Sequence, residues 1–204
     1  MKKIILSICL LSFSTCFLYA QDKDEDEKKG FKKENLFTGG SVSLAFYNNT
    51  FLIGASPVFG YSLGNWGDAG IVVNYSYTSY RDYNFILNDK LRQSVYGGGA
   101  FVKLYPVRFL FAQAQFEHNT IKQKFIPNIG VNQTYTINAN SFLIGGGYTT
   151  GRYGKGGQPF YYLAVLFDVS GNINSPYTDG LGRAIPIIRG GLQVPLFQGA
   201  GRSR

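Results

Sequence analysis

The chain has 204 residues and a formal net charge of +8, but only 16% of its residues are charged, whereas 45% are hydrophobic. A soluble domain of this length usually carries many more charges on its surface. The basic residues are scattered and form no basic helix, which argues against a nucleic-acid-binding protein. The positive balance instead favours contact with anionic lipid or saccharide.

Residues 1–20 have the pattern of a secretory signal peptide. Two lysines precede a short apolar run, and Ala20 precedes the polar stretch QDKDEDEKK. This pattern describes a cleaved signal rather than a spanning helix. Both cysteines, Cys9 and Cys16, lie in this segment, so the mature chain would have neither a disulfide nor a thiolate metal site. The alternative is a lipoprotein signal acylated at Cys16, although the preceding FST matches that pattern poorly.

A charged leader follows at residues 21–35, with six acidic residues and five lysines. It contains almost nothing apolar to bury, so we expect it to be solvated and disordered. The remaining length suits one domain at residues 36–197 and a short tail at 198–204.

Apolar residues recur with a period of two throughout this domain, and no window has a convincing period of 3.6. The alternation predicts β-strands at 38–47, 50–63, 69–80, 91–105, 108–119, 134–149, 159–170 and 184–197. Short turns at one end and long loops at the other are typical of an outer-membrane barrel. The connections at 64–68 and 105–108 are short, and those at 81–90, 120–133 and 171–183 are long. The two-residue connection at 48–49 departs from this layout.

The two faces of the predicted strands have different chemistry. One is rich in Val, Ile, Leu, Tyr and Phe, and the other carries Asn, Ser, Thr, Gln and Gly with few charges. A soluble barrel would expose Lys and Glu and keep its cavity apolar. Small polar residues suit a narrow interior, and aromatic residues suit membrane interfaces. We therefore predict an all-β fold, an eight-stranded antiparallel up-and-down transmembrane β-barrel, whose closure leaves no unpaired edge in lipid.

The alternation places Lys103, Glu117, Asp168 and Arg189 on the inward face. On the lipid face, a basic group at mid-depth would cost about 2–4 kcal/mol. Because a single loop joins the last two strands, we expect Asp168 to lie nearly level with Arg189 and to form a buried ion pair with it. The charges could form a plug or a gate, and the plug is favoured because side chains fill an eight-stranded barrel.

Two segments carry a resemblance to a known family. ASPVFGYSLGNWGDAGIVVNYSY (55–77) and the closing IIRGGLQVPLF resemble the outer-membrane β-barrel domain family common in Bacteroidota, which is related in architecture to OmpA-type and OmpX-type barrels. The resemblance covers about residues 36–197 and implies a place in the cell outer membrane, in contact with lipid or lipopolysaccharide. QGAGRSR (198–204) follows the terminal aromatic residue Phe197, which departs from many such barrels.

We expect a small non-enzymatic scaffold or interaction protein, either a monomer or a subunit of a membrane complex with outer-membrane protein partners. The sequence identifies no catalytic, cofactor-binding or metal-binding residue. We expect the long loops to lie outside the cell and to supply the contacts with partners, through the side chains of Tyr83, Phe85, Ile86, Lys122, Lys124, Phe125 and Tyr177. The alternatives are a narrow pore and a subunit of a larger outer-membrane machine.

A lipid A-modifying enzyme is a further alternative, because some eight-stranded barrels acylate or deacylate that lipid. The stretch HNT places the only histidine, His118, on the same outward face as Thr120. A nucleophile needs a base that a third group orients, but Glu117 points to the other face and the next strand offers no nearby acid. A histidine at the membrane interface is therefore the favoured interpretation.

Overall fold

The computed structural model describes residues 31–47, 50–82, 88–152, 158–178 and 182–197. The expected signal segment, most of the charged leader and the C-terminal tail lie outside the described residues. The last part of the leader is described: Lys33–Asn35 forms a short 3₁₀ turn, and the Lys32 N–H donates to the Tyr61 hydroxyl at 3.1 Å. Within the described ranges, no helix is both long and apolar enough to cross a membrane.

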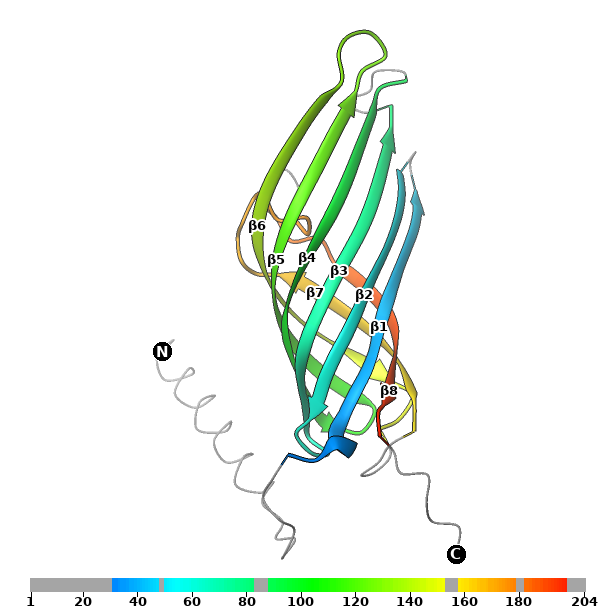
Figure 1. Ribbon diagram of the computed structural model, residues 1–204, viewed down its shortest axis with the longest axis vertical. Helices are drawn as coiled ribbons and strands as arrows, with labels where there is room; N and C mark the ends of the chain where they lie inside the picture. Colours follow the sequence, from blue (N-terminus) through cyan, green and yellow to red (C-terminus); the bar gives the residue numbers. More distant parts are fainter. Residues whose placement is uncertain (1–30, 48–49, 83–87, 153–157, 179–181, 198–204) are drawn as a thin grey trace, which may run out of the picture. The chain divides into compact units, whose positions relative to one another are not determined.

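Eight antiparallel strands close into an up-and-down barrel, in which each strand pairs with its neighbours in sequence and the last pairs with the first (Figure 1). The predicted all-β fold, an eight-stranded antiparallel up-and-down barrel, is confirmed. The strands are β1 (Leu36–Tyr47), β2 (Thr50–Ser62), β3 (Gly67–Arg81), β4 (Lys90–Val107), β5 (Leu110–Ile126), β6 (Gln133–Thr149), β7 (Phe160–Asp168) and β8 (Ile187–Pro195).

Alternation of inward and outward side chains organises the ring, and it is clearest in β7. In β7 buried and exposed residues alternate without interruption, so that Tyr162, Ala164 and Leu166 fill the interior while Leu163 and Val165 face outward. This is the period-two geometry of a pleated strand. The same geometry brings the polar residues of β3 and β5 into the barrel.

The strands differ in length, which leaves part of the sheet outside the closed ring. β7 and β8 have nine residues each, whereas β4 has 18 and β5 and β6 have 17. β6 pairs with β7 only from Leu143 to Thr149, so the long strands continue beyond the ring at one end (Figure 1). We call this part the extension. It consists of the paired segments 77–81 of β3, 90–94 of β4, 122–126 of β5 and 133–136 of β6.

Aromatic side chains pack the middle of the interior. Tyr105, Phe111 and Tyr162 form one buried cluster with Ala164. Phe111 and Tyr162 meet edge to face, with ring centroids 6.1 Å apart. A Cβ on Gly191 would overlap the Tyr162 ring and the carbonyl of the neighbouring strand, so only glycine leaves room for that ring. Polar centres lie on both sides of this layer.

Candidate functional site

The interior of the barrel holds the charged side chains that the strand pattern placed there. Lys103, Glu117, Asp168 and Arg189 are all buried. Each lies at an inward position of its strand, in β4, β5, β7 and β8 respectively. Their partners decide what the interior can do.

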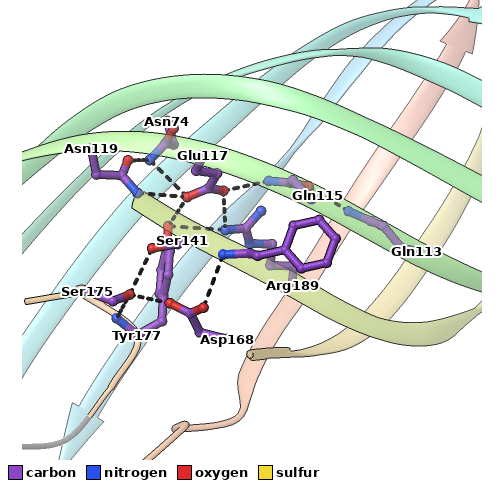
Figure 2. Close-up of polar contacts among 11 residues, drawn as sticks. Asn74, Gln113, Gln115, Glu117, Asn119, Ser141, Asp168, Ser175, Tyr177 and Arg189 are labelled. Atoms are coloured by element: carbon purple, nitrogen blue, oxygen red, sulfur yellow. Dashed lines mark hydrogen bonds and ion pairs between the residues drawn. The ribbon is translucent and has the colours of Figure 1, made fainter. Parts of the chain in front are cut away.

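Glu117 is fully buried, with 0% of its surface exposed, and side-chain amides surround its carboxylate (Figure 2). Along β5, Gln115 donates to Oε1 at 2.5 Å and Asn119 donates to Oε2 at 3.0 Å. From β3, Asn74 donates to Oε2 at 3.4 Å. Gln113 continues this row by donating to Gln115 at 2.6 Å. A buried carboxylate needs such donors, because an unpaired charge in the interior is strongly destabilising.

Two further donors complete what we call the Glu117 centre. Arg189 Nη2 donates to Oε1 at 3.0 Å in an ion pair, and the Tyr177 hydroxyl donates to Oε2 at 2.7 Å. Burial and the adjacent carboxylate both raise the pKa of Tyr177, so its hydroxyl stays protonated. Tyr177 belongs to the β7–β8 connection, which therefore reaches into the barrel. The centre joins β3, β5, β8 and this connection.

The prediction that Asp168 pairs with Arg189 was wrong, because the carboxylate that pairs with Arg189 is that of Glu117. Arg189 lies opposite Ala164 of β7, four residues before Asp168. Asp168 lies beyond the β7–β8 ladder, which ends at Leu166 and Ile187. Because the long connection does not fold back as a tight hairpin, the two residues are not level, and Arg189 reaches Glu117 instead.

Asp168 holds the start of the β7–β8 connection. Its Oδ1 accepts the backbone N–H groups of Phe142 and Ser170, at 3.1 and 2.9 Å. Its Oδ2 accepts the Ser175 hydroxyl at 2.5 Å, and that hydroxyl lies 2.8 Å from the hydroxyl of Ser141 in β6 (Figure 2). Charge-assisted hydrogen bonds of this kind are the strong ones, so the connection is fastened across the mouth of the ring.

A second buried carboxylate, Asp68, lies at the short-turn end and was not predicted from the sequence. It is fully buried. Its Oδ1 accepts Ser62 at 2.8 Å and Arg152 at 2.6 Å, and its Oδ2 accepts Tyr105 at 3.1 Å and Gln193 at 3.0 Å. We call this set the Asp68 centre. The strand predicted at 69–80 began one residue too late to include Asp68, although the inward parity of β3 continues to it.

Arg152 closes the short-turn rim from the β6–β7 connection. Besides Asp68, it donates to the backbone carbonyls of Gly64 at 2.7 Å and Asn65 at 3.3 Å. Its guanidinium lies 4.4 Å from the centroid of the Tyr105 ring. The Gly-rich segment that contains Arg152 has no periodicity, so no pattern in the sequence marks this residue as inward.

Lys103 lies between the two centres without a carboxylate partner among the described residues. Its Nζ is 4.0 Å from the centroid of Tyr162, 5.1 Å from that of Phe111 and 5.6 Å from that of Phe101. Aromatic faces attract a cation at these distances. A cavity of about 10 Å³ beside Lys103, Gln115 and Arg189 has room for about one water molecule, so the interior here is filled.

The residues expected in external loops lie in three different settings. Lys122 and Lys124 are exposed, but they belong to β5 rather than to a loop, and Phe125 is half-buried in the same strand. Tyr177 points inward to Glu117, so its expected role as an outer contact is corrected. Tyr83, Phe85 and Ile86 lie outside the described residues.

His118 and Thr120 do not form a nucleophile and base. His118 Nδ1 lies 2.6 Å from Asn140 Oδ1, and Thr120 donates to Asn138 at 2.9 Å, so each is paired across to β6. The Glu117 carboxylate is buried on the other side of the sheet. Within the described ranges, no group of three His, Cys, Asp or Glu side chains could hold a metal ion.

Comparison with known proteins gives a structural similarity only. No family model matches the chain, and no curated protein matches it. Among solved structures, the chain is similar to Ail, the attachment invasion locus protein of Yersinia pestis, crystallised with the heparin analogue sucrose octasulfate. The two share 9% identity with a TM-score of 0.42, over 78% of this chain and 89% of that one.

Proposed function

We propose that this chain is an integral outer-membrane β-barrel with a closed, side-chain-filled interior, and that it acts as a non-enzymatic scaffold or interaction protein. The observation that carries the proposal is the inversion of the usual distribution of polarity. Ile71, Leu163 and Ile188 face outward with 58, 54 and 65% of their surface exposed, whereas Asp68 and Glu117 are fully buried. Exposed apolar surface of this extent marks an interaction site, and around a whole barrel the fitting partner is lipid.

The outward apolar side chains form a band around the barrel, which we call the apolar belt. Exposed aromatic residues at both ends of this belt support the proposed membrane location. At the short-turn end Trp66, Phe109, Tyr148 and Tyr161 are exposed, and the rings of Phe109 and Tyr148 lie 6.3 Å apart. At the other end Tyr75 and Tyr96, both exposed, are directly opposite each other in β3 and β4. Such girdles occur at the two interfaces of outer-membrane barrels. The nine residues of β7 match a tilted strand that crosses the hydrocarbon core.

The filled interior supports a scaffold rather than a pore. Three features close the inside: the Glu117 centre, the aromatic layer around Lys103 and the Asp68 centre at the rim. The Arg189 and Arg152 side chains that complete the two centres are only 7 and 11% exposed. An aqueous channel through the barrel would require these two arginine side chains to move aside and break their ion pairs, so a steady channel is not expected.

Cell fractionation and bilayer recording test the proposal. The full chain, expressed in a Gram-negative host, should sediment with the outer membrane, resist carbonate extraction and migrate differently in SDS gels before and after boiling. Purified protein in planar bilayers should give no steady conductance. Recovery in the soluble fraction would contradict the membrane proposal, and a steady open channel would contradict the closed interior.

A further inference from the structure

A cluster of basic side chains covers the outward side of the extension. Its five members are Arg81 on β3, Lys90 and Arg92 on β4, and Lys122 and Lys124 on β5. We call this surface the basic face. All are exposed except Lys90, which is half-buried. Their positions share the outward parity of Tyr75 and Tyr96.

The register of the strands brings like charges together on the basic face. Arg81 lies directly opposite Lys90, and Arg92 lies directly opposite Lys124. Like charges at opposite positions of an antiparallel pair destabilise the sheet. Because the fold gains nothing from these pairs, their placement points to a ligand that neutralises them.

No carboxylate of the described chain neutralises the basic face. None of its five members makes an ion pair among the described residues. Two acidic residues flank the face in sequence, and their described bonds are to backbone groups: Asp82 accepts the N–H of Asn88 at 2.9 Å, and the buried Asp89 accepts that of Asn128 at 2.7 Å. With five cations and two flanking carboxylates, the face keeps an excess of three positive charges, and its natural partner carries several negative charges.

The distance of the basic face from the aromatic girdle indicates which kind of anion can reach it. Arg92 lies four residues beyond Tyr96 on β4, which is about 13 Å along a strand at about 3.3 Å per residue. For a strand tilt of about 40°, this is about 10 Å above the aromatic girdle. Lipid headgroups, and not acyl chains, lie at that level when the belt occupies the hydrocarbon core.

We propose that the basic face binds the phosphate groups of phosphorylated saccharide headgroups in the surrounding outer leaflet, an inference that rests on the proposed membrane location. Opposite side chains of an antiparallel pair have Cβ atoms about 5 Å apart. The two cations of each like-charge pair can therefore hold one phosphate between them. The Arg81–Lys90 and Arg92–Lys124 pairs occupy neighbouring rows, which suits a headgroup with two phosphates. Arginine adds planar, bidentate recognition.

Lipid titration of the folded barrel tests the proposal. Native mass spectrometry of the full chain in neutral detergent micelles would count bound lipopolysaccharide of short saccharide length and give an apparent Kd. The Arg92→Gln/Lys124→Gln variant should bind about 25-fold more weakly, at about fivefold for each charge removed. The charge-conserving Arg92→Lys/Lys124→Arg variant should stay within a few-fold of the parent. Arg108→Gln, at an exposed arginine of the short-turn end, is the matched control and should bind as the parent does.

The phosphates and the source of the anion are tested in separate arms. Dephosphorylated lipopolysaccharide should bind weakly to the parent and should not distinguish the variants. Equal binding of the phosphorylated lipid to the parent and the double Gln variant would overturn the proposal. The proposal would also be overturned if a soluble sulfated polysaccharide, and not the phosphorylated lipid, bound the parent more tightly than the double Gln variant. Outer-membrane fractionation of the same variants separates the two ideas: a barrel that inserts but does not recognise phosphate contradicts only the headgroup proposal.

Discussion

Glu117 and Asp68 are both fully buried carboxylates inside one barrel, but they hold different parts of it together. The donors to Glu117 are all side chains, from three strands and from the connection that enters the mouth of the ring. Asp68 lies at the rim, where its arginine also binds the backbone carbonyls of a turn. If Asp68 is lost, Arg152 keeps these acceptors, whereas Arg189 without Glu117 keeps, among the residues that the structure describes, only the Tyr177 hydroxyl, at 3.3 Å.

This difference predicts that the Glu117 centre contributes more to stability. Arg189→Met should have the largest effect, because it leaves the Glu117 charge buried and uncompensated. The expected loss is about 3–5 kcal/mol in the free energy of unfolding. Urea titration of the barrel folded in lipid vesicles measures it, and the single tryptophan, Trp66, exposed at the short-turn girdle, reports unfolding.

A second variant separates loss of the charge pair from loss of packing. Glu117→Gln/Arg189→Met removes both charges and keeps an acceptor for the neighbouring amides, so it should be more stable than Arg189→Met alone. If the double variant is the less stable of the two, the uncompensated charge is not the cause. Arg108→Met, on the exposed surface, should change the free energy by no more than about 0.5 kcal/mol.

The pairing of Arg189 shows which features of this interior could be predicted from the sequence and which could not. Alternation predicted the eight strands and the inward parity of Lys103 and Glu117, because both depend only on neighbours along one strand. The pairing of Asp168 with Arg189 depended on the register between two strands across a long connection. That register is set by where the connection folds, and no short-range pattern in the sequence records it.

The Asp68 centre was missed for a related reason. Asp68 is the second residue of β3, where strand and turn signals overlap, and Arg152 lies in an aperiodic segment. The basic face was visible only as scattered cations, because its members come from three strands and meet only when the register is known. Tyr177 was expected outside, since an aromatic residue in a long polar loop gives no sign that the loop enters the barrel.

Asp68→Asn should have the second largest effect, at about 2 kcal/mol. The substitution removes the charge opposite Arg152 but leaves one amide oxygen as an acceptor, and hydrogen bonds to charged groups contribute about 1.5–3 kcal/mol. The urea midpoint in lipid vesicles measures the loss. A loss equal to or larger than that of Arg189→Met would reverse the order of the two centres.

Tyr177→Phe tests the link between the Glu117 centre and the mouth. The hydroxyl bond to Glu117 is lost, but the carboxylate keeps its amide and guanidinium donors, so a loss of about 1.5 kcal/mol is expected, at the low end for a bond to a charged group. The effect should be local as well: hydrogen exchange of amides 172–178 should become faster, because the connection loses its contact with Glu117 and keeps the bonds of Asp168, Ser175 and Asn172 to β6. Unchanged exchange in this segment would show that Tyr177 does not fasten it.

Lys103→Met should have the smallest effect and so sharpens the contrast between paired and unpaired interior charges. Lysine gains cation–π attraction from the Tyr162, Phe111 and Phe101 rings, worth up to about 2 kcal/mol when desolvated. It also bears the desolvation of a buried ammonium group, which methionine of similar length avoids. The two terms oppose each other, so a change below about 1 kcal/mol is expected in the same urea titration. A loss as large as that of Arg189→Met would mean that Lys103 belongs to the electrostatic interior as a third centre, with the aromatic layer depending on its charge.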